Sequence, residues 1–282
     1  MVYFYTKERN MIVFPKAKIN IGLHITRKRP DGYHDIETIF YPVNFTDALE
    51  FTESEEGENG DRFTETGIAT GCPSDDNLVM KALRLLRDKY SFPILNIHLH
   101  KAIPSGAGLG GGSSDAAFLL KSVTRHYNLE ANEEMDKAMA LEIGSDCPFF
   151  IDSAPSFASG RGELLKPVTP VLAGYYLVLL NPGVGISTGD AYRNSSPSIP
   201  ENSLQKLFND PPESWKESVF NDFEDYAFKV HPVIGELKSE LYNSGAIFSL
   251  MSGSGSSVFG IFKSKPSLTG ILKLCLIWEG SL

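Results

Sequence analysis

The sequence predicts a mixed α/β (α+β) protein of two domains, and three observations support this expectation. The chain has 282 residues, enough for one large or two moderate domains. A strand pattern, a glycine-rich loop and a helix pattern follow one another over residues 95–127. A further buried strand pattern begins at Tyr175, after a stretch punctuated by Gly and Pro. We therefore expect an N-terminal domain of residues 1–165 and a C-terminal domain of residues 166–282.

Composition limits the classes of partner. The formal net charge is -9, whereas binding to a nucleic-acid backbone needs a basic face. No run of 18 or more apolar residues occurs, so we expect no membrane span. The N-terminal residues lack the pattern of a signal or transit peptide, which indicates a cytoplasmic protein. Three widely separated cysteines, Cys72, Cys147 and Cys275, argue against a disulfide framework or a zinc site and suit that reducing compartment.

The first strong pattern predicts a hairpin. In residues 17–27 apolar side chains alternate with polar ones, so one face of a strand is buried and the other carries Lys18 and Asn20. Turn chemistry follows, because Pro presets φ and Gly permits positive φ. Residues 33–41 then form the returning strand. Three successive basic residues before the turn are either a solvated tip or an anion-steering element.

Two segments before the glycine-rich loop predict a hairpin and a helix. Residues 52–76 are rich in Glu, Gly, Ser and Asp, which is typical of a surface hairpin and loop. Residues 77–90 have an apolar stripe at helical spacing, and Asp75 or Asp76 is the expected N-cap. The helix leads into the strand pattern that precedes the loop.

The glycine-rich loop, residues 104–114, is the main functional signal. It has five glycines in the seven positions 106–112, between the strand pattern and an apolar helix stripe. Glycines let the backbone approach a ligand, so that successive N–H groups and a helix N-terminus can converge on phosphate oxygens. Ser113 or Ser114 is the expected N-cap, with Asp115 in the first turn. We interpret this stretch as a phosphate-binding loop.

Other glycine-rich elements fit the sequence less well. A Walker A loop ends in Gly-Lys-Ser/Thr, and its lysine is absent here. The dinucleotide fingerprint requires a following strand with a terminal acid, whereas residues 131–143 have a helical pattern. The catalytic and metal-binding signatures of protein kinases are missing from the sequence. A flexible linker has polar flanks, but the flanks here are periodic and apolar.

An acid and a thiol follow the helix of residues 131–143. Asp146 and Cys147 stand between Gly144 and an apolar, strand-like run. A carboxylate beside a core is costly unless it is paired or functional, so Asp146 is either a functional carboxylate or a helix cap. Cys147 is expected to be a small buried side chain rather than a nucleophile.

The C-terminal half repeats the α/β pattern. A buried strand covers residues 175–180, and a short loop then leads into a helix that carries Tyr192. Helices are expected over residues 215–229 and 232–244. A second glycine-serine loop, residues 252–257, stands between two strand-like runs and by itself predicts a hairpin turn. The end of the chain carries no informative motif.

Three segments together resemble the GHMP kinase superfamily of small-molecule kinases. They are residues 15–20, the glycine-rich loop and residues 251–255, and they occur in the expected order. Residues 31–34, 76–78 and 144–148 are similar to one branch of it, whose members phosphorylate an alcohol linked to cytidine diphosphate in the non-mevalonate synthesis of isoprenoid precursors. The resemblance implies an N-terminal ribosomal-protein-S5-domain-2-like domain and a C-terminal ferredoxin-like domain.

The resemblance also implies the reaction and its participants. The γ-phosphoryl group of ATP is transferred, with Mg²⁺, to a hydroxyl group of the small-molecule cytidine-diphosphate-linked substrate. The enzyme is expected to be a monomer or a homodimer. Asp146 is the implied general base, while Lys18 stabilises the developing alkoxide and keeps Asp146 ionised. Because the loop has no lysine, backbone N–H groups, a helix dipole and the metal must meet the charge of the phosphoryl group.

The implied binding residues form three groups. Contacts with ATP are assigned to Pro104, Ser105, Gly106, Ala107, Gly108, Leu109, Gly110, Gly111, Gly112, Ser113 and Ser114 of the loop, and to Asn77 and Lys101 near the adenine. Contacts with the substrate are assigned to Asn20, Tyr33, His34, Thr188, Tyr192 and Gly253. Of these, Tyr33, His34 and Tyr192 are expected around the cytosine base. Ser113 or Ser114 is also the expected ligand of the metal.

Two alternatives stay open at this point. A GHMP kinase could act on another acceptor, such as mevalonate, homoserine or a sugar, although residues 31–34 favour the cytidylated alcohol. A non-catalytic nucleotide-binding protein could keep the loop as a sensor, although Lys18 and Asp146 are both present.

Overall fold

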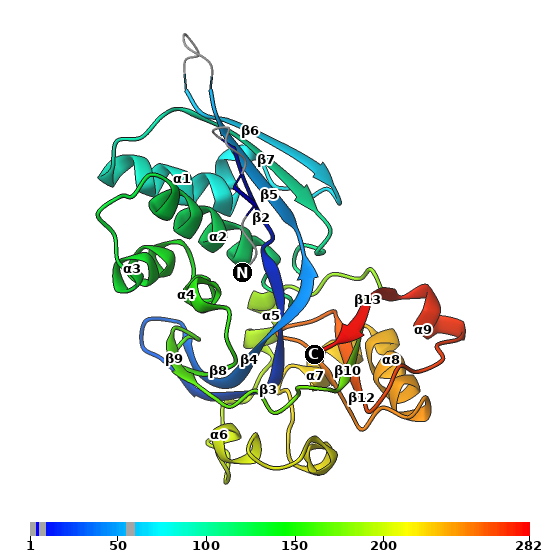
Figure 1. The fold of residues 1–282 in the computed structure, drawn as a ribbon. Coiled ribbons are helices and arrows are strands. Elements are labelled where there is room, and N and C mark those ends of the chain that lie inside the picture. Colours follow the sequence, from blue (N-terminus) through cyan, green and yellow to red (C-terminus); the bar gives the residue numbers. More distant parts are fainter. Residues whose placement is uncertain (1–3, 6–9, 55–59) are drawn as a thin grey trace. The chain divides into compact units, whose positions relative to one another are not determined.

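The fold is that of a computed structural model, which describes residues 4–5, 10–54 and 60–282 (Figure 1). The chain packs into two compact units. Unit 1 comprises Met1–Ala17, Phe45–Ser105 and Gly110–Ser153, and unit 2 comprises Lys18–Asn44, Gly106–Leu109 and Ala154–Leu282. Neither unit is continuous in the sequence, and the glycine-rich loop is divided between them. The single boundary after residue 165 stays a prediction.

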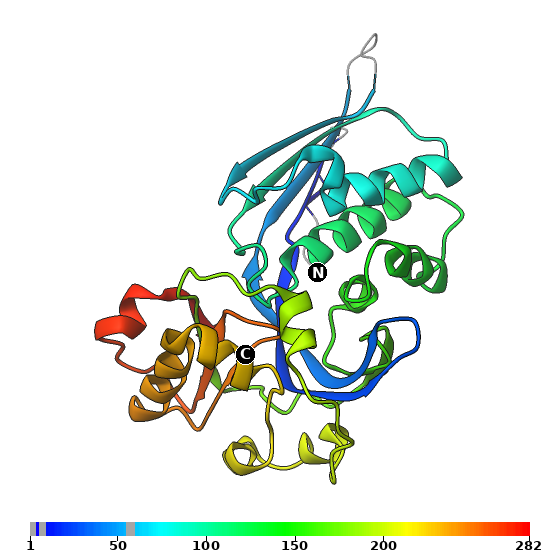
Figure 2. The same cartoon turned by 180° about the vertical axis from the view of Figure 1, so that it is seen from behind.

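Unit 1 is built on a sheet accompanied by helices (Figures 1 and 2). Its strands are β1 (Phe4–Tyr5), β2 (Asn10–Val13), β5 (Ala48–Glu53), β6 (Arg62–Gly67) and β7 (Leu95–Lys101), in the order β1-β2-β5-β7-β6. Its helices are the 3₁₀ turn η1 (Ser74–Asp76), α1 (Leu78–Lys89), α2 (Gly111–His126), α3 (Glu133–Ile143) and α4 (Cys147–Asp152). Alternate residues of β7, Leu95, Ile97 and Leu99, are buried, which confirms the strand pattern before the loop.

The expected surface hairpin over residues 52–76 is wrong. β5 and β6 do not pair with each other, because β7 lies between them and pairs with both. β5 runs antiparallel to β7, with Leu49 opposite Leu99, while β6 runs parallel to β7, with Phe63 opposite Ile97. A strand buried in mid-sheet needs a hydrogen-bonded neighbour on each side. The later strand β7 therefore inserts between two strands that are close in sequence.

Two helix starts differ from the expected ones. The cap of α1 is Asn77, whose Oδ1 accepts a hydrogen bond from the backbone N–H of Val79 (2.9 Å), whereas Asp75 and Asp76 lie in η1. The run after Asp146, expected to be strand-like, forms the helix α4. Its residues from Cys147 to Ile151 are all buried, and a continuous apolar run has no periodicity that separates a strand from a helix.

Unit 2 contains two four-stranded sheets. The first has the order β3-β4-β8-β9, from β3 (Lys16–Lys28), β4 (His34–Thr46), β8 (Ser156–Ser159) and β9 (Leu164–Pro167), and β3 and β4 each extend into unit 1. The second has the order β11-β12-β10-β13, from β10 (Tyr176–Leu180), β11 (Phe248–Met251), β12 (Val258–Phe262) and β13 (Leu276–Ser281). The hairpin expected over residues 17–41 and the strand expected over residues 175–180 are confirmed.

In chain order, the helices of unit 2 come between β10 and β13 of the second sheet. They are α5 (Thr188–Arg193), α6 (Leu204–Leu207), the 3₁₀ helix η2 (Pro212–Glu217), α7 (Glu224–Val230), α8 (Pro232–Asn243) and α9 (Gly270–Leu274). α7 and α8 contribute Ala227, Ile234, Leu237 and Leu241 to the core, together with residues of that sheet. Among the described helices of the chain, none is both long and apolar enough to cross a membrane.

The second sheet has ferredoxin-like topology. β10 pairs antiparallel with β12 and β13, and β12 pairs antiparallel with β11. Helices α7 and α8 precede β11, β12 follows β11 directly, and α9 leads into β13. This is the β-α-β-β-α-β sequence of elements expected for the C-terminal domain. β13 itself had no pattern that predicted it.

Residues 215–229, expected as one helix, are divided between η2 and α7. The segment between them bonds to β3 instead. The backbone N–H of Leu23 donates to Phe220 O (2.8 Å), and that of Asp222 donates to Leu23 O (2.9 Å). Local periodicity cannot show such long-range bonds, which replace the helical ones. The helix expected over residues 232–244 is confirmed as α8.

Candidate active site

Lys18 and Asn20 lie on the polar face of β3, as their spacing predicts. Both are buried, with 4% and 1% of their surface exposed. Lys18 Nζ donates to Asn20 Oδ1 (2.5 Å) and to Gly108 O (3.1 Å). Asn20 Nδ2 donates to Thr38 Oγ1 (2.9 Å), and this hydroxyl donates to Gly22 O (2.6 Å). The ammonium and the amide are therefore held in defined orientations inside unit 2.

Residues 106–109 of the glycine-rich loop are bound to unit 2 through their carbonyl groups. Three consecutive carbonyl oxygens accept hydrogen bonds. Ala107 O accepts from the backbone N–H of Ser257 (3.2 Å), and Leu109 O accepts from the backbone N–H of Lys18 (2.9 Å). Gly108 O accepts from Ser252 Oγ (2.9 Å) and from Lys18 Nζ (3.1 Å). In a trans peptide the N–H points opposite to the C=O. The N–H groups of Gly108, Leu109 and Gly110 therefore point away from these partners, as an anion-binding loop requires.

The second glycine-serine loop packs directly on these residues. A Cβ atom on Gly108 would lie 1.9 Å from Ser252 O, and one on Gly253 would lie 3.2 Å from the Cα of Gly108. Thr188 Oγ1 lies 3.0 Å from the hydroxyl of Ser254, beside Gly253. Parts of all three segments that resemble the GHMP kinases thus meet within unit 2.

Asn221 supports the second loop, and it is a functional residue that the sequence does not predict. Its Nδ2 donates to Met251 O and to Gly253 O, both at 2.8 Å, and its Oδ1 accepts from the backbone N–H of Phe223 (3.0 Å). The side chain is buried, so these bonds fix the carbonyls at the base of the loop. No local pattern identifies this role, because the two carbonyls lie 30 and 32 residues further along the chain.

The rest of the glycine-rich loop opens α2 in unit 1. Gly110 occupies the N-cap position with a φ of 69°, in the left-handed region, and no side chain caps the helix. The expectation that Ser113 or Ser114 is the N-cap is therefore wrong, because both lie in the first turn. A helix N-terminus without a side-chain cap keeps N–H groups that can bind an anion.

Exposure differs along the loop. Ser105, Gly106 and Gly112 are exposed, Pro104 is half-buried, and Ala107, Leu109 and Gly111 are buried. A Cβ atom on Gly111 would lie 2.9 Å from Ile103 Cγ2, so a glycine is required where the helix begins.

Lys101 is part of a buried ion cluster in unit 1. Its ammonium donates to Asp47 and to Asp115 (2.7 Å to Oδ2), and only 1% of its side chain is exposed. Burial lowers the pKa of Lys101, but attraction to the two carboxylates outweighs it, so the net pKa is raised. Asp47 also accepts from the backbone N–H of Ala102 (2.6 Å) and Ile103 (2.9 Å), which shapes the strand end before the loop.

The Lys101 ammonium is thus paired with carboxylates of its own unit, and its expected place near the adenine stays a prediction. Burial raises the pKa of Asp115 well above its ordinary value, although the charge of Lys101 opposes this shift. Asn77, the other residue expected near the adenine, caps α1 and has 8% of its surface exposed. Its contact with ATP stays a prediction.

Replacing Lys101 with Met is expected to destabilise the fold by about 3–5 kcal/mol, because it leaves two buried carboxylates without their shared cation. The free energy of unfolding from urea titration measures this loss. Lys81→Met, at an exposed position of α1, is the control and is expected to change stability by less than about 0.5 kcal/mol. A loss below about 1 kcal/mol for Lys101→Met would show that the cluster is not a major source of stability.

Asp146 occupies the N-cap position of α4, with φ and ψ of -83° and -18°. Its side chain makes no capping hydrogen bond to that helix. The residue is half-buried in unit 1, directly before the buried Cys147. The structure therefore gives no support to a capping role, one of the two interpretations that the sequence left open.

Cys147 is expected to resist alkylation in the native protein. Burial raises the pKa of its thiol to about 12, although a hydrogen bond with Ser113 opposes the shift. The thiolate is the reactive form, so its population at pH 8 is negligible. Iodoacetamide at that pH is expected to label the exposed Cys72 and to spare Cys147 until the protein unfolds. Peptide mass spectrometry measures the labelling of both cysteines, and equally fast labelling of Cys147 and Cys72 would indicate that Cys147 is a nucleophile.

The residues expected around the cytosine base lie in unit 2. The rings of His34 and Tyr192 stack, with centroids 4.7 Å apart and planes inclined by 14°. The rings of Tyr192 and Phe223 are perpendicular, with centroids 4.9 Å apart. Burial and the nearby charge of Lys28 lower the pKa of His34, so its ring is neutral near pH 7. Tyr33 is 57% exposed.

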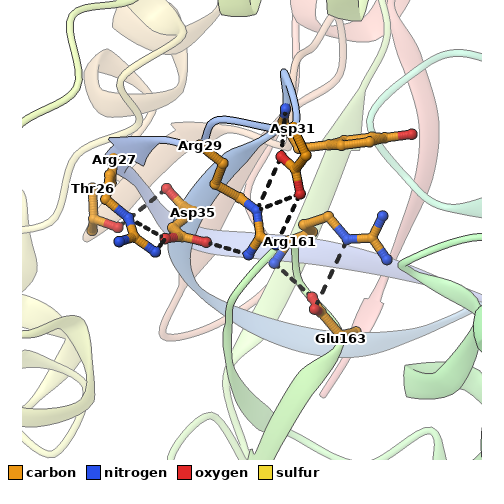
Figure 3. Close-up of polar contacts among 8 residues, drawn as sticks. Thr26, Arg27, Arg29, Asp31, Asp35, Arg161 and Glu163 are labelled. Atoms are coloured by element: carbon orange, nitrogen blue, oxygen red, sulfur yellow. Dashed lines mark hydrogen bonds and ion pairs between the residues drawn. The ribbon is translucent and has the colours of Figure 1, made fainter.

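The basic run before the turn is paired with acids at the hairpin tip (Figure 3). Arg27 Nε donates to Asp35 Oδ2 (2.7 Å), and Arg29 Nη1 donates to Asp35 Oδ1 (3.0 Å). Arg29 Nε also donates to both carboxylate oxygens of Asp31, at 3.2 and 3.0 Å. Two of the three cations are thus engaged in local ion pairs, which favours the interpretation of this run as a structured, solvated tip.

Comparisons with known proteins show the family. The family model for the GHMP kinases N terminal domain matches residues 77–156, and that for the GHMP kinases C terminal domain matches residues 203–272. A relative from Parabacteroides distasonis is 50% identical over 276 residues, which cover 96% of this chain and 100% of the relative. One from Bacteroides thetaiotaomicron is 48% identical over 258 residues, covering 92% and 94%. The chain belongs to the GHMP kinases.

Both of these relatives are 4-diphosphocytidyl-2-C-methyl-D-erythritol kinases. A crystal structure of 4-(cytidine 5'-diphospho)-2C-methyl-D-erythritol kinase is 31% identical, with a TM-score of 0.71 over 89% of this chain and 90% of that one. A homoserine kinase from Cytophaga hutchinsonii, 20% identical with a TM-score of 0.65, shares the fold over 94% of this chain and 89% of that one. The expected two-domain GHMP kinase fold is confirmed, and membership of this kinase family implies the use of ATP.

Proposed function

We propose that this chain transfers the γ-phosphoryl group of ATP to the 2-hydroxyl group of 4-diphosphocytidyl-2-C-methyl-D-erythritol, in the non-mevalonate synthesis of isoprenoid precursors. The observation that carries the proposal is the shared attachment of Lys18 and Ser252 to the carbonyl of Gly108. This attachment brings together the three segments that define the family. Relatives named for that kinase, which the chain matches over nearly its full length, support the choice of acceptor.

The catalytic roles follow from charge and proton transfer. The acceptor hydroxyl must lose a proton, and Asp146 is the proposed general base. The oxygen gains negative charge as it attacks, and the ammonium of Lys18 stabilises that charge. Lys18 is buried and hydrogen-bonded to Asn20, so its ammonium needs no reorganisation during the reaction. The loop N–H groups and the start of α2 hold the phosphate oxygens.

Mg²⁺ is the proposed metal, and one residue in the first turn of α2, Ser113, is the candidate ligand. The hydroxyl of Ser114 is fully buried and has no hydrogen-bond partner among the described residues, so it faces the interior. Ser113 is half-buried and is the remaining candidate. Within the described ranges no group of three or more His, Cys, Asp or Glu side chains can hold a metal. Mg²⁺ suits such a site because it takes phosphate and water oxygens as most of its ligands and neutralises phosphate charge.

The cytosine base is proposed to bind beside Tyr33, His34 and Tyr192. A neutral His34 offers one ring N–H donor and one ring nitrogen acceptor, which match the donor and acceptor groups on the edge of cytosine. Thr188 and Gly253 lie at the second glycine-serine loop and are proposed to contact the rest of the substrate, together with Asn20. A kinase that acts on mevalonate or homoserine needs no group of this kind, because neither acceptor carries a base.

The decisive experiment is a panel of acceptors with ATP and Mg²⁺. Turnover of 4-diphosphocytidyl-2-C-methyl-D-erythritol, detected as ADP release and as a new phosphomonoester in ³¹P spectra, is the expected result. Mevalonate, homoserine and galactose are expected to remain unreacted. Turnover of one of these in place of the cytidylated alcohol would change the assigned acceptor, and binding of ATP without any turnover would indicate a nucleotide sensor.

A further inference from the structure

Tyr33 is an exposed ring on a fixed backbone. Its surface is 57% exposed, although an aromatic ring is stabilised most when it is buried. Its backbone N–H donates to Asp31 Oδ1 (3.1 Å), and the Asp31 carboxylate accepts from Arg29 Nε at 3.2 and 3.0 Å. The ion pairs at the hairpin tip therefore hold the chain at Tyr33 without covering the ring.

Arg161 lies against one face of this ring. Its guanidinium carbon is 4.9 Å from the centre of the Tyr33 ring. Arg161 comes from the turn between β8 and β9, where its backbone N–H donates to Glu163 Oε2 (2.6 Å) and its Nε lies 3.9 Å from Glu163 Oε1 (Figure 3). The turn is tied to the hairpin because the N–H of Ile36 donates to Gly160 O (2.7 Å). The ring and the guanidinium are thus supported from two different turns.

We infer that Arg161 is a positioning residue, which holds the Tyr33 ring as a platform and leaves its opposite face for the cytosine base. This inference rests on the proposed function. A guanidinium is planar and attracted to the electron-rich face of an aromatic ring, so it restricts the ring's rotation while its own edge stays hydrated. A ring that is already oriented loses less conformational freedom when a base stacks on it.

The test is a double-mutant cycle on the KM for 4-diphosphocytidyl-2-C-methyl-D-erythritol at saturating ATP. Arg161→Met keeps an unbranched stem and removes the guanidinium. It is expected to raise this KM about two- to five-fold, the size of an exposed cation–π contact, with kcat and the KM for ATP unchanged. In a Tyr33→Leu background the same substitution is expected to have no further effect, because Arg161 acts through the ring.

Lys166→Ala is the matched control. It removes an exposed cation from β9, in the same β8–β9 hairpin, and is expected to leave all three constants unchanged. Arg161→Lys keeps the charge without the planar group and is expected to give an intermediate KM. It replaces Arg161→Met in the cycle if that variant does not fold.

Three outcomes overturn the inference. An equal effect of Arg161→Met with and without Tyr33 means that Arg161 contacts the substrate itself, and a fall in KM means that the guanidinium competes with the base for the ring. The proposed function fails separately, if the unmodified protein does not turn over the cytidylated alcohol. Normal turnover by the unmodified protein, with an Arg161→Met variant of the same KM, contradicts the positioning role alone.

Discussion

Replacing Asp146 with Asn is expected to lower kcat by about 10²- to 10⁴-fold, the usual contribution of a positioned general base. Asn keeps the shape of the side chain but cannot accept the proton of the acceptor hydroxyl. The binding of ATP is expected to stay nearly unchanged, because the phosphates are assigned to the glycine-rich loop. The carboxylate makes no capping bond to α4, so its replacement removes no cap from that helix.

Single-turnover kinetics and calorimetric titration with ATP separate these two effects. Asp152→Asn is the control: it alters a carboxylate at the other end of α4, where Asp152 Oδ2 pairs with Lys137 Nζ (2.6 Å). Its kcat is expected to remain that of the unmodified protein. An Asp146→Asn variant with unchanged turnover would remove Asp146 from the reaction, and one that loses both turnover and ATP binding would assign it to the nucleotide site.

The parts of the site that could be predicted depend on local patterns. Lys18 and Asn20 share a face because the side chains of a strand alternate, and alternation is visible in ten residues of sequence. The glycine-rich loop is recognisable from five glycines in seven positions between a strand and a helix pattern, and Gly106, Gly108 and Gly110 do take the positive φ that other residues adopt at a cost. Its close contact with the second glycine-serine loop follows from no local pattern, because the two loops lie far apart in the sequence.

The parts that could not be predicted depend on contacts between distant residues. The resemblance alone assigns Lys101 to the adenine, and no local pattern shows that its ammonium pairs with Asp47 and Asp115, which lie 54 and 14 residues away. Asn221 stands in a stretch with helical periodicity, which gives no sign that its side chain binds the carbonyls of Met251 and Gly253. Helical or strand periodicity reports which face is buried, and it carries no information on which partner satisfies a buried polar group.

The errors in secondary structure also arise where a local pattern does not identify the partner of a segment. The run from Cys147 to Ile151 is buried on every side, so a helix and a strand give the same apolar pattern. The composition of residues 52–76 predicts a surface hairpin, but composition does not show which strands pair. β7 has buried residues that need hydrogen-bonded strands on both sides, and its insertion between β5 and β6 meets that need.

Replacing Gly108 with Ala is expected to lower kcat/KM for ATP by about 10²-fold, the effect of displacing a positioned group by roughly 1 Å. The new Cβ atom would lie 1.9 Å from the carbonyl oxygen of Ser252 and 2.9 Å from its carbon. Both are backbone atoms, so no side-chain rotation relieves the overlap. The loop has to move away from Ser252, and the carbonyl of Gly108 then loses its bonds to Lys18 and to the Ser252 hydroxyl.

Gly106→Ala separates this overlap from backbone strain. Gly106 has a φ of 65°, close to the 77° of Gly108, but a Cβ atom there meets nothing within 4 Å. Both variants therefore carry a similar strain of about 1–2 kcal/mol from the left-handed backbone, and only Gly108→Ala adds the clash. We expect Gly106→Ala to keep kcat/KM for ATP within about tenfold of the unmodified value. Equal losses in the two variants would mean that strain alone accounts for the effect, and that the packing of the two loops does not hold the phosphate-binding backbone in place.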